Sequence, residues 1–319
     1  MRALVWHGGT ELSLDELPEP APGQGQVVFD VEVAGICGSD LHAYRGHPGP
    51  RVPPLVLGHE AIGSVEGRAG RFAVFPLVVC GRCAACRRGE ENLCAERGLL
   101  GLDRQGVFAD RVAVREDALV PVPDGVDPRV AVLVEPLAAS VSVLRLDRVE
   151  EGDRVLVLGG GPIGLLGVWA ALRRGAHVTC VEPLPERRAV AERFGAHVVL
   201  ADAADVPPGD ADVAIDAVGI EPTWRAAIAG VRSGGRVALV GLGQADGGMP
   251  AVDLVRRGIT VRGHYAYTRS DFADALALLA EAPPPLDWLT SLPLAEGAAG
   301  FRRLVEEPDA VTKILLSPR

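Results

Sequence analysis

A glycine-rich turn that follows an apolar strand and opens a helix is the feature that most constrains this fold. The strand is predicted over residues 154–158, and the turn, residues 159–164, reads GGGPIG. This spacing fits the G-x-G-x-x-G fingerprint of dinucleotide sites, which carries weight only in such a strand–turn–helix context. Gly159 permits a tight turn, Gly161 lets a pyrophosphate approach the backbone, and Gly164 lets the helix pack close to the strand. An ordinary strand–helix turn without a ligand is the alternative.

A carboxylate follows at the end of the next predicted strand, residues 177–181. There, Glu182 can accept hydrogen bonds from both hydroxyls of an adenosine ribose and would repel a 2′-phosphate, which favours NAD over NADP. Arg187 and Arg188 weaken that preference if either side chain turns toward the ribose. The alternative is that Glu182 is only a solvated charge at a strand end.

The second half of the chain alternates strands with helices. Helices are predicted over 162–174 and 186–194, and further strands over 197–200, 212–216, 235–240 and 259–262. This alternation predicts a doubly wound parallel sheet with helices on both faces, which makes the domain α/β.

The first part of the chain shows short strands separated by turns rich in proline and glycine. Residues 26–33 alternate apolar and polar side chains, the period of a half-buried strand. We therefore expect a β-rich domain over 1–145, completed by 270–319 with a closing strand at 312–316. The nucleotide-binding domain is expected over 146–269.

Charge and hydropathy exclude several classes of protein. A formal net charge of −10 disfavours a nucleic-acid partner, which needs a basic face. No apolar run reaches the about 18 residues of a membrane span. Residues 1–8 lack the basic and apolar regions of a signal peptide, so we expect a cytoplasmic protein without a membrane partner.

Four of the six cysteines, Cys80, Cys83, Cys86 and Cys94, lie close together in the sequence. In a cytosolic enzyme such a cluster indicates metal binding before disulfides. Four thiolates around one tetrahedral ion suit a structural zinc, because no coordination position stays open. A zinc ribbon for nucleic acid or protein and an iron–sulfur cluster are the alternatives.

A second group of potential ligands lies earlier in the chain. Residues 35–42 read GICGSDLH, and residues 58–60 read GHE. Cys37 and His59 are a mixed sulfur and nitrogen pair, typical of a catalytic zinc that keeps one position open. From their spacing alone, Cys37 can equally well be a small buried residue and His59 a core histidine.

Taken together, these motifs, Val134-Glu135-Pro136-Leu137 and the closing residues 311–316 resemble the zinc-containing medium-chain alcohol dehydrogenases. The resemblance spans nearly the whole chain and is nearest to the polyol (sorbitol) and threonine dehydrogenase branch. It implies a GroES-like catalytic domain and a Rossmann domain, with the active site in the cleft between them. One departure is that the segment between Glu60 and Cys80 is shorter than the family pattern, which places a β-hairpin there.

The resemblance also implies the roles of individual residues. Cys37 and His59 match ligands of the catalytic zinc, and Asp40 matches the carboxylate that orients the ligand histidine. Glu60 matches a carboxylate that lies close to the metal and can enter its shell. Glu135 occupies the place of a third ligand and would bind the zinc directly or through water. Ser39 and His42 match a proton relay, and Lys313 falls near a position that approaches the cofactor phosphates. Tyr44 is a candidate for the substrate wall. The expected cofactor contacts are Gly159, Gly161, Pro162, Ile163, Gly164, Glu182, Arg187, Val218 and Gly241.

The expected function is zinc-dependent hydride transfer between NAD and a secondary alcohol: a polyol, a sugar alcohol or an amino alcohol such as threonine. Two zinc ions per chain are expected, one catalytic and one structural. Rival possibilities are a simple alcohol dehydrogenase and a non-catalytic nucleotide-binding homologue. The latter would lack some of the candidate ligands and relay residues, and none is missing. Family precedent suggests a homotetramer or a homodimer with the Rossmann edge strands as one contact.

Overall fold

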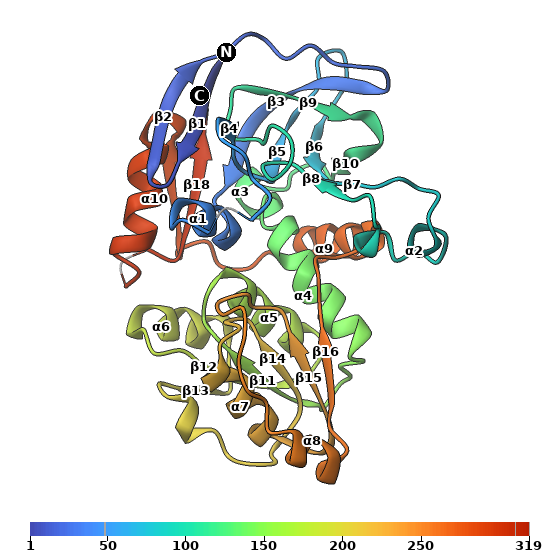
Figure 1. The fold of residues 1–319 in the computed structure, drawn as a ribbon, viewed down its shortest axis with the longest axis vertical. Coiled ribbons are helices and arrows are strands. Elements are labelled where there is room, and N and C mark those ends of the chain that lie inside the picture. The colour runs from blue at the N-terminus through green and yellow to red at the C-terminus, as the bar shows by residue number, and fades with distance from the viewer. Residues whose placement is uncertain (48, 310, 319) are drawn as a thin grey trace. The chain divides into compact units, whose positions relative to one another are not determined.

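The computed structural model describes residues 1–47, 49–309 and 311–318, which form two compact units (Figure 1). The first unit contains residues 1–135 and 268–319, and the second contains residues 136–267. The expected boundary at residue 145 falls near the end of helix α4 (Val134–Leu146), whereas the structural division falls near its start.

The second unit is built on a six-stranded parallel sheet. Its order is β13 (Val198–Leu200), β12 (His177–Val181), β11 (Arg154–Leu158), β14 (Ala211–Asp216), β15 (Val231–Leu239) and β16 (Thr260–Gly263). The chain winds in one direction from β11 to β13 and in the other from β14 to β16. In such sheets ligands bind outside the carboxyl ends of the strands, at the point where the order reverses.

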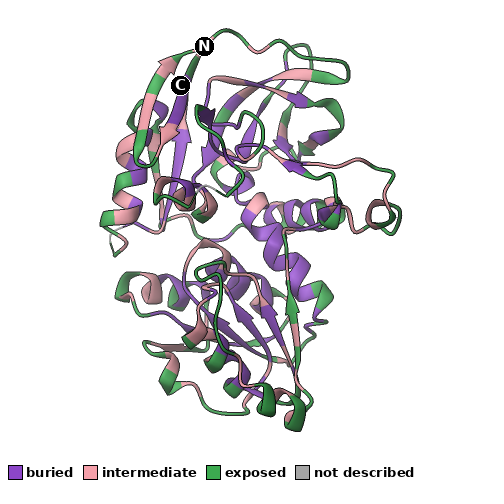
Figure 2. Ribbon diagram, viewed as in Figure 1, coloured by how far each residue is buried: buried purple, intermediate pink, exposed green. Residues whose placement is uncertain are grey.

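Helices cover this sheet, and its central strands β12, β11 and β14 are largely buried, whereas the edge strands β13 and β16 are not (Figure 2). α5 (Pro162–Arg173) contacts β11 and β12 and packs on α6 (Pro185–Phe194), while α7 (Glu221–Gly230) contacts β14 and β15. α8 (Ala251–Arg257) precedes the edge strand. The doubly wound α/β fold is confirmed. One strand was predicted too short: β15 begins at Val231 instead of Gly235, because Val231 already pairs with Ala211 before a register irregularity.

The first unit is mainly antiparallel. Its seven-stranded sheet runs β10 (Leu119–Val122), β6 (Arg71–Val74), β5 (Glu60–Ser64), β3 (Gln26–Gly35), β18 (Lys313–Ser317) and β17 (Leu289–Pro293), with β9 (Arg111–Arg115) also paired to β3. Smaller sheets join β2 (Glu11–Glu16), β1 (Arg2–Gly8) and β4 (Leu55–Val56), and β7 (Leu77–Val78) with β8 (Gly98–Leu99). β5 and β6 are antiparallel neighbours joined by residues 65–70.

The helices of this unit are short apart from two near its C-terminal end. They are α1 (Gly38–Tyr44), α2 (Ala84–Arg87), α3 (Pro128–Ala131), α9 (Arg269–Glu281) and α10 (Gly297–Glu306), with 3-10 turns at Glu91–Leu93, Glu116–Ala118 and Leu294–Glu296, and a further one in the second unit at Ala203–Asp205. No helix of the described residues is both long and apolar enough to cross a membrane.

The last strand joins the first unit next to the segment that carries the candidate ligands. β18 pairs antiparallel with β3, so that Leu315 faces Gly35 and Leu316 faces Ala34. The predicted strand at 312–316 is thus observed one residue later, at 313–317. This pairing places Lys313 in the neighbourhood of residues 35–37.

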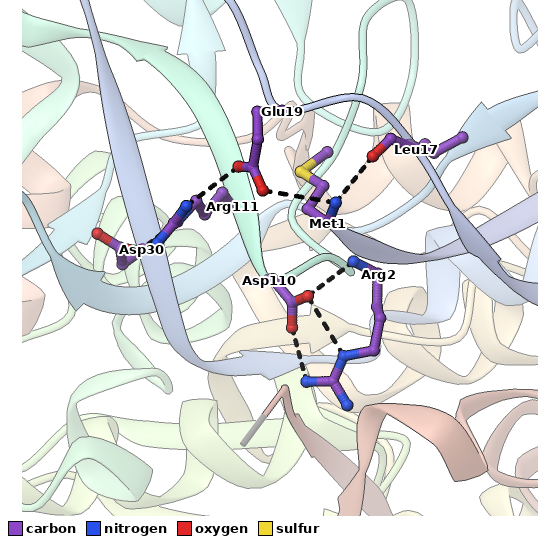
Figure 3. A network of polar contacts seen from close by, with 7 residues as sticks. All are labelled: Met1, Arg2, Leu17, Glu19, Asp30, Asp110 and Arg111. Atoms are coloured by element: carbon purple, nitrogen blue, oxygen red, sulfur yellow. Dashed lines mark hydrogen bonds and ion pairs between the residues drawn. The ribbon is translucent and has the colours of Figure 1, made fainter.

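A polar network ties the N-terminus to this unit (Figure 3). The Met1 ammonium donates to the Leu17 carbonyl at 2.8 Å and lies 3.5 Å from Glu19. Arg111 bridges Glu19 and Asp30 at 3.1 and 2.7 Å. Exposed pairs of this kind contribute about 0–1 kcal/mol each, so we assign the network an anchoring role only.

Candidate dinucleotide and metal sites

The glycine turn has the geometry that its sequence predicted. Gly159 has a φ of +101°, where an L side chain is strained. A Cβ at Gly164 would lie 1.8 Å from the Gly159 carbonyl oxygen, so the first turn of α5 packs directly on the loop. A Cβ at Gly161 would meet nothing within 4 Å, which leaves its face open to a ligand. The protein's own structure therefore requires glycine at positions 159 and 164. The open face of Gly161 is instead available to a ligand.

Glu182 is a buried acceptor and not a solvated strand-end charge. It is 4% exposed. One carboxylate oxygen accepts the Gly160 N–H at 2.6 Å, and the other accepts the Leu184 N–H at 2.9 Å. Each oxygen keeps a further lone pair for a ligand hydroxyl.

A cavity of about 560 Å³ opens beside these residues. Gly159, Gly161, Glu182, Arg187 and Val218 line it. Arg188 instead donates to the backbone oxygens of residues 182 and 183.

The remaining expected cofactor contacts lie outside the cavity lining. Pro162, Ile163 and Gly164 form the first turn of α5. A Cβ at Gly241 would come within 2.2 Å of the Val218 backbone, so Gly241 packs behind a residue of the wall.

Sequence reasoning missed Asp216, which holds the loop that carries Val218. The Asp216 carboxylate is fully buried and accepts the N–H groups of Val218 and Gly219 at 3.0 Å. Burial raises the pKa of Asp216 even though these bonds favour its ionised form. The signal was an aspartate at the end of a buried strand, three residues before Gly219.

The four cysteines of the lobe converge as their spacing predicted. Their sulfur atoms all lie within 4.8 Å of one another. The Cys83–Cys86 and Cys80–Cys94 sulfur distances are 3.5 and 3.6 Å, too long for disulfides. The Cys86 N–H donates to the Cys83 sulfur, and such bonds lower the pKa of Cys83 to about 6. A preformed cage of four sulfurs fits a tetrahedral zinc.

Cys37, His59 and Glu60 form a second group whose ligand atoms lie within 4.8 Å of one another. Cys37 caps α1, and Glu60 begins β5. Between them, Gly58 has a φ of +92° and sets the direction of the chain into His59. Burial, with the charge of Glu60, raises the pKa of Cys37 to about 11. A thiolate here therefore needs a cation, which fits a metal ligand.

A buried cation already lies beside this group. The Lys313 ammonium donates to both carboxylate oxygens of Glu60, at 2.7 and 2.5 Å, and to the Ile36 carbonyl at 2.9 Å. Burial is the largest influence and lowers the pKa of Lys313, but Glu60, Cys37 and Glu135 together raise it above its usual value. Lys313, which was expected near the cofactor phosphates, is bound to Glu60 beside the candidate metal ligands. Glu135, in the first turn of α4, is not among the three converging ligands.

The two expected relay residues occupy different environments. Ser39 Oγ lies 3.5 Å from His59 Nε2, on the side of the ring that faces away from Asp40. His42 is half-buried, and burial, followed by the charges of Arg45 and His47, lowers its pKa. His42 is therefore held in its neutral, proton-accepting form.

Several other residues can be placed. Tyr44 packs on Phe301 with ring centroids 5.6 Å apart. Trp224, Trp288 and Cys180 are buried. His264 Nε2 lies 2.6 Å from a carboxylate oxygen of Asp147, which lies far from it in the sequence.

Comparisons with known proteins agree with this geometry. Residues 23–124 match the family described as alcohol dehydrogenase GroES-like domain, and residues 162–281 match zinc-binding dehydrogenase. A sorbitol dehydrogenase of Halalkalibacterium halodurans is 34% identical over 88% of this chain and 89% of its own. The (R,R)-butanediol dehydrogenase of Bacillus subtilis is 32% identical over the full length of both.

Solved structures give the same result. The alcohol dehydrogenase of Thermus sp. ATN1 superimposes with a TM-score of 0.92 over all of both chains at 29% identity. A zinc-binding dehydrogenase of Sinorhizobium meliloti bound to NADP has a TM-score of 0.90 at 28% identity, covering 99% of each chain. The fold and the site therefore define a nicotinamide-dependent oxidoreductase with a GroES-like and a Rossmann-like unit. The chain belongs to the zinc-containing medium-chain alcohol dehydrogenase family.

Proposed function

We propose that this enzyme oxidises a secondary hydroxyl of a polyol, a sugar alcohol or an amino alcohol such as threonine, with NAD as the hydride acceptor, in the cytoplasm. The convergence of Cys37, His59 and Glu60 carries the proposal, because it supplies a mixed ligand set for a catalytic zinc. Catalysis is assigned to residues 1–145 with 270–319, and nucleotide binding to 146–269. A sorbitol and a butanediol dehydrogenase among the relatives support substrates with a secondary hydroxyl.

Two zinc ions per chain are part of this proposal. Cys37 and His59 would hold the catalytic ion, with Glu60 or Glu135 as the third ligand, and the four-cysteine lobe would hold the structural one. When bound, the catalytic ion supplies Lewis-acid polarisation of the substrate hydroxyl. The raised pKa of Cys37 supports the assignment, since a nearby cation is needed to keep that sulfur ionised.

Ser39 and His42 would carry the proton away from the substrate. Ser39 lies beside a candidate ligand, at 3.5 Å from the His59 ring. Its hydroxyl would accept the substrate proton while donating its own along a path that ends on His42. The lowered pKa of His42 supports this role, because an imidazole that is neutral at pH 7 can accept a proton.

The preference for NAD rests on Glu182. Its buried carboxylate lines the cavity and would meet a 2′-phosphate with its own negative charge. Arg187 lines the same cavity and acts in the opposite direction. The ratio of kcat/KM for NAD to that for NADP measures the balance, and Glu182→Gln should lower the ratio.

The experiment that tests the function is the initial rate of NAD reduction across polyols, sugar phosphates, threonine and simple alcohols, with and without a zinc chelator. Chelator-sensitive turnover on secondary hydroxyls is expected. Best rates on primary alcohols without further hydroxyls would favour a simple alcohol dehydrogenase. No turnover with two zinc ions still bound would favour a non-catalytic homologue.

For the assembly we propose a homodimer, or a homotetramer built from it, that uses the edge strand β16. This strand has a neighbour on one side only among the described residues, β15. On the adjacent α8, Val252 and Val255 are 62% and 82% exposed, which favours a covered surface. Light scattering of the parent and of Val255→Glu tests this assignment, since the variant should shift toward the monomer.

A further inference from the structure

We propose that Arg51 is a positioning residue for the candidate catalytic metal, acting through Asp40 on His59. This inference rests on the proposed function, because it assumes that Cys37 and His59 bind a metal. The inference is supported by the contacts that Asp40 and Arg51 make with three backbone segments, at Cys37, Gly58 and Gly101.

Arg51 is a buried cation at 6% exposure. Its Nε donates to the Gly101 carbonyl at 2.8 Å. Its Nη2 lies 3.8 Å from Asp40 Oδ1, and the two side chains are 4% and 0% exposed. An arginine shielded to this degree is not a solvated surface charge, and its guanidinium has a fixed orientation.

Asp40 is the point at which both ligand-bearing segments meet. Its Oδ2 accepts the N–H of Cys37 at 3.1 Å. Its Oδ1 accepts the N–H of Gly58 at 3.3 Å and lies 3.7 Å from His59 Nδ1. One carboxylate therefore holds the backbone at the sulfur ligand and at the turn before the nitrogen ligand, and its negative charge lies beside the imidazole ring.

The carbonyl that anchors Arg51 belongs to a loop packed on that same turn. A Cβ at Gly101 would lie 2.6 Å from the Gly58 nitrogen, and one at Gly106 would lie 2.3 Å from the Leu57 carbonyl oxygen. The Val107 N–H donates to the Gly58 carbonyl at 3.1 Å. Arg51 thus links this loop to Asp40 across the backbone that presents His59.

Charge gives the physical reason for an arginine at this place. A fully buried carboxylate is costly unless an opposite charge or several hydrogen bonds compensate it. Arg51 supplies a permanent positive charge on a planar guanidinium. Its Nε donates to the Gly101 carbonyl while its Nη2 lies within ion-pair distance of Asp40. A lysine ammonium is less suited to making both contacts at once. Residues behind metal ligands commonly change metal affinity about 10–100-fold when replaced.

The test compares zinc retention in the parent, Arg51→Gln and Arg51→Lys during titration with a competing chelator. The parent should release its catalytic zinc first and its cysteine-bound zinc later. In Arg51→Gln we expect release of the first ion at about tenfold lower chelator concentration, with the second unchanged. Arg51→Lys should recover part of the loss. Arg104→Gln is the matched control, because Arg104 is an exposed arginine of the same loop.

Cobalt substitution and binding of NADH supply readouts that do not depend on turnover. A changed cobalt absorption band with unchanged NADH affinity is expected for Arg51→Gln. Equal retention of both ions in Arg51→Gln and the parent would overturn the inference, as would simultaneous loss of both ions with no rescue by lysine. If Arg51→Gln does not fold, Arg51→Lys decides by the same measurement. A parent that holds zinc only in the cysteine lobe would instead refute the proposed function itself.

Discussion

Lys313 and Glu60, which are 253 residues apart in the chain, form an ion pair whose side chains are 1% and 0% exposed. Glu60 is also a candidate metal ligand. Its negative charge would therefore interact both with Lys313 and with a metal ion bound to Cys37. The fit is close, because a Cβ at Gly35 would overlap a Glu60 oxygen at 1.9 Å. The two members of this pair therefore depend on each other for stability.

Replacing Lys313 with methionine should lower the free energy of unfolding by about 3–5 kcal/mol, because it leaves Glu60 buried without its countercharge. Denaturant unfolding measures the loss. The double variant Lys313→Met with Glu60→Gln should recover much of it, since no uncompensated charge remains. A single variant as stable as the parent would show that the ion pair has no net role.

Two glycines of the same loop should respond differently to alanine. In Gly161→Ala the new methyl meets no protein atom within 4 Å, so the melting temperature should stay close to that of the parent while NAD affinity falls by tenfold or more. In Gly164→Ala the methyl would overlap the Gly159 carbonyl, so stability should fall too. Thermal melting and NADH fluorescence distinguish the two effects. Unchanged NADH affinity in Gly161→Ala would contradict the phosphate role.

The two metal groups should separate by mutation. Cys37→Ser should lose one zinc and all turnover while keeping NADH binding, because the nucleotide cavity lies in the other unit. Cys83→Ser should lose the other zinc and a large part of its stability, since the lobe loses one of four ligands. Metal analysis and thermal melting check both. Strong residual activity in Cys37→Ser would refute the catalytic assignment.

The proposed relay predicts a shifted acid limb in the pH profile. Burial and the charges of Arg45 and His47 hold the pKa of His42 below its usual 6.5, so kcat/KM should fall only when the pH drops below that value. Arg45→Gln removes one of the repelling charges, and the limb should move to higher pH. His42→Ala should remove it. If the acid limb of kcat/KM lies at the same pH in both variants, a group other than His42 is responsible for it.

Local patterns were enough to predict the Rossmann-like unit and the clustering of the four cysteines, whereas Cys37, His59 and Glu60 were grouped as ligands through the family resemblance. The alternation of strands and helices defined the parallel sheet, and the glycine spacing matched a geometry in which Gly159 has a positive φ. The cysteine spacing likewise corresponds to sulfur atoms within 4.8 Å of one another. In each case the residues that determine the structure lie close together in the chain.

Contacts between distant segments could not be predicted in this way. No periodicity relates Lys313 to Glu60, so the ion pair between them could not be predicted. His264 and Asp147 meet because β16 and the end of α4 are brought together by the whole sheet. Arg51 looked like one arginine among many, and only its burial and its position beside Asp40 set it apart.

The return of the C-terminal segment to the first unit has a consequence for biosynthesis. Residues 136–267 are a contiguous stretch and can fold as soon as they leave the ribosome, because all their contacts within the unit are then available. The first unit must wait for β17 and β18, which are translated last. Until Lys313 emerges, Glu60 lacks its lysine partner and β3 lacks one of its neighbouring strands. Nascent chains should therefore acquire nucleotide affinity before they acquire a finished metal site, and chaperones would meet an unfinished β-rich half.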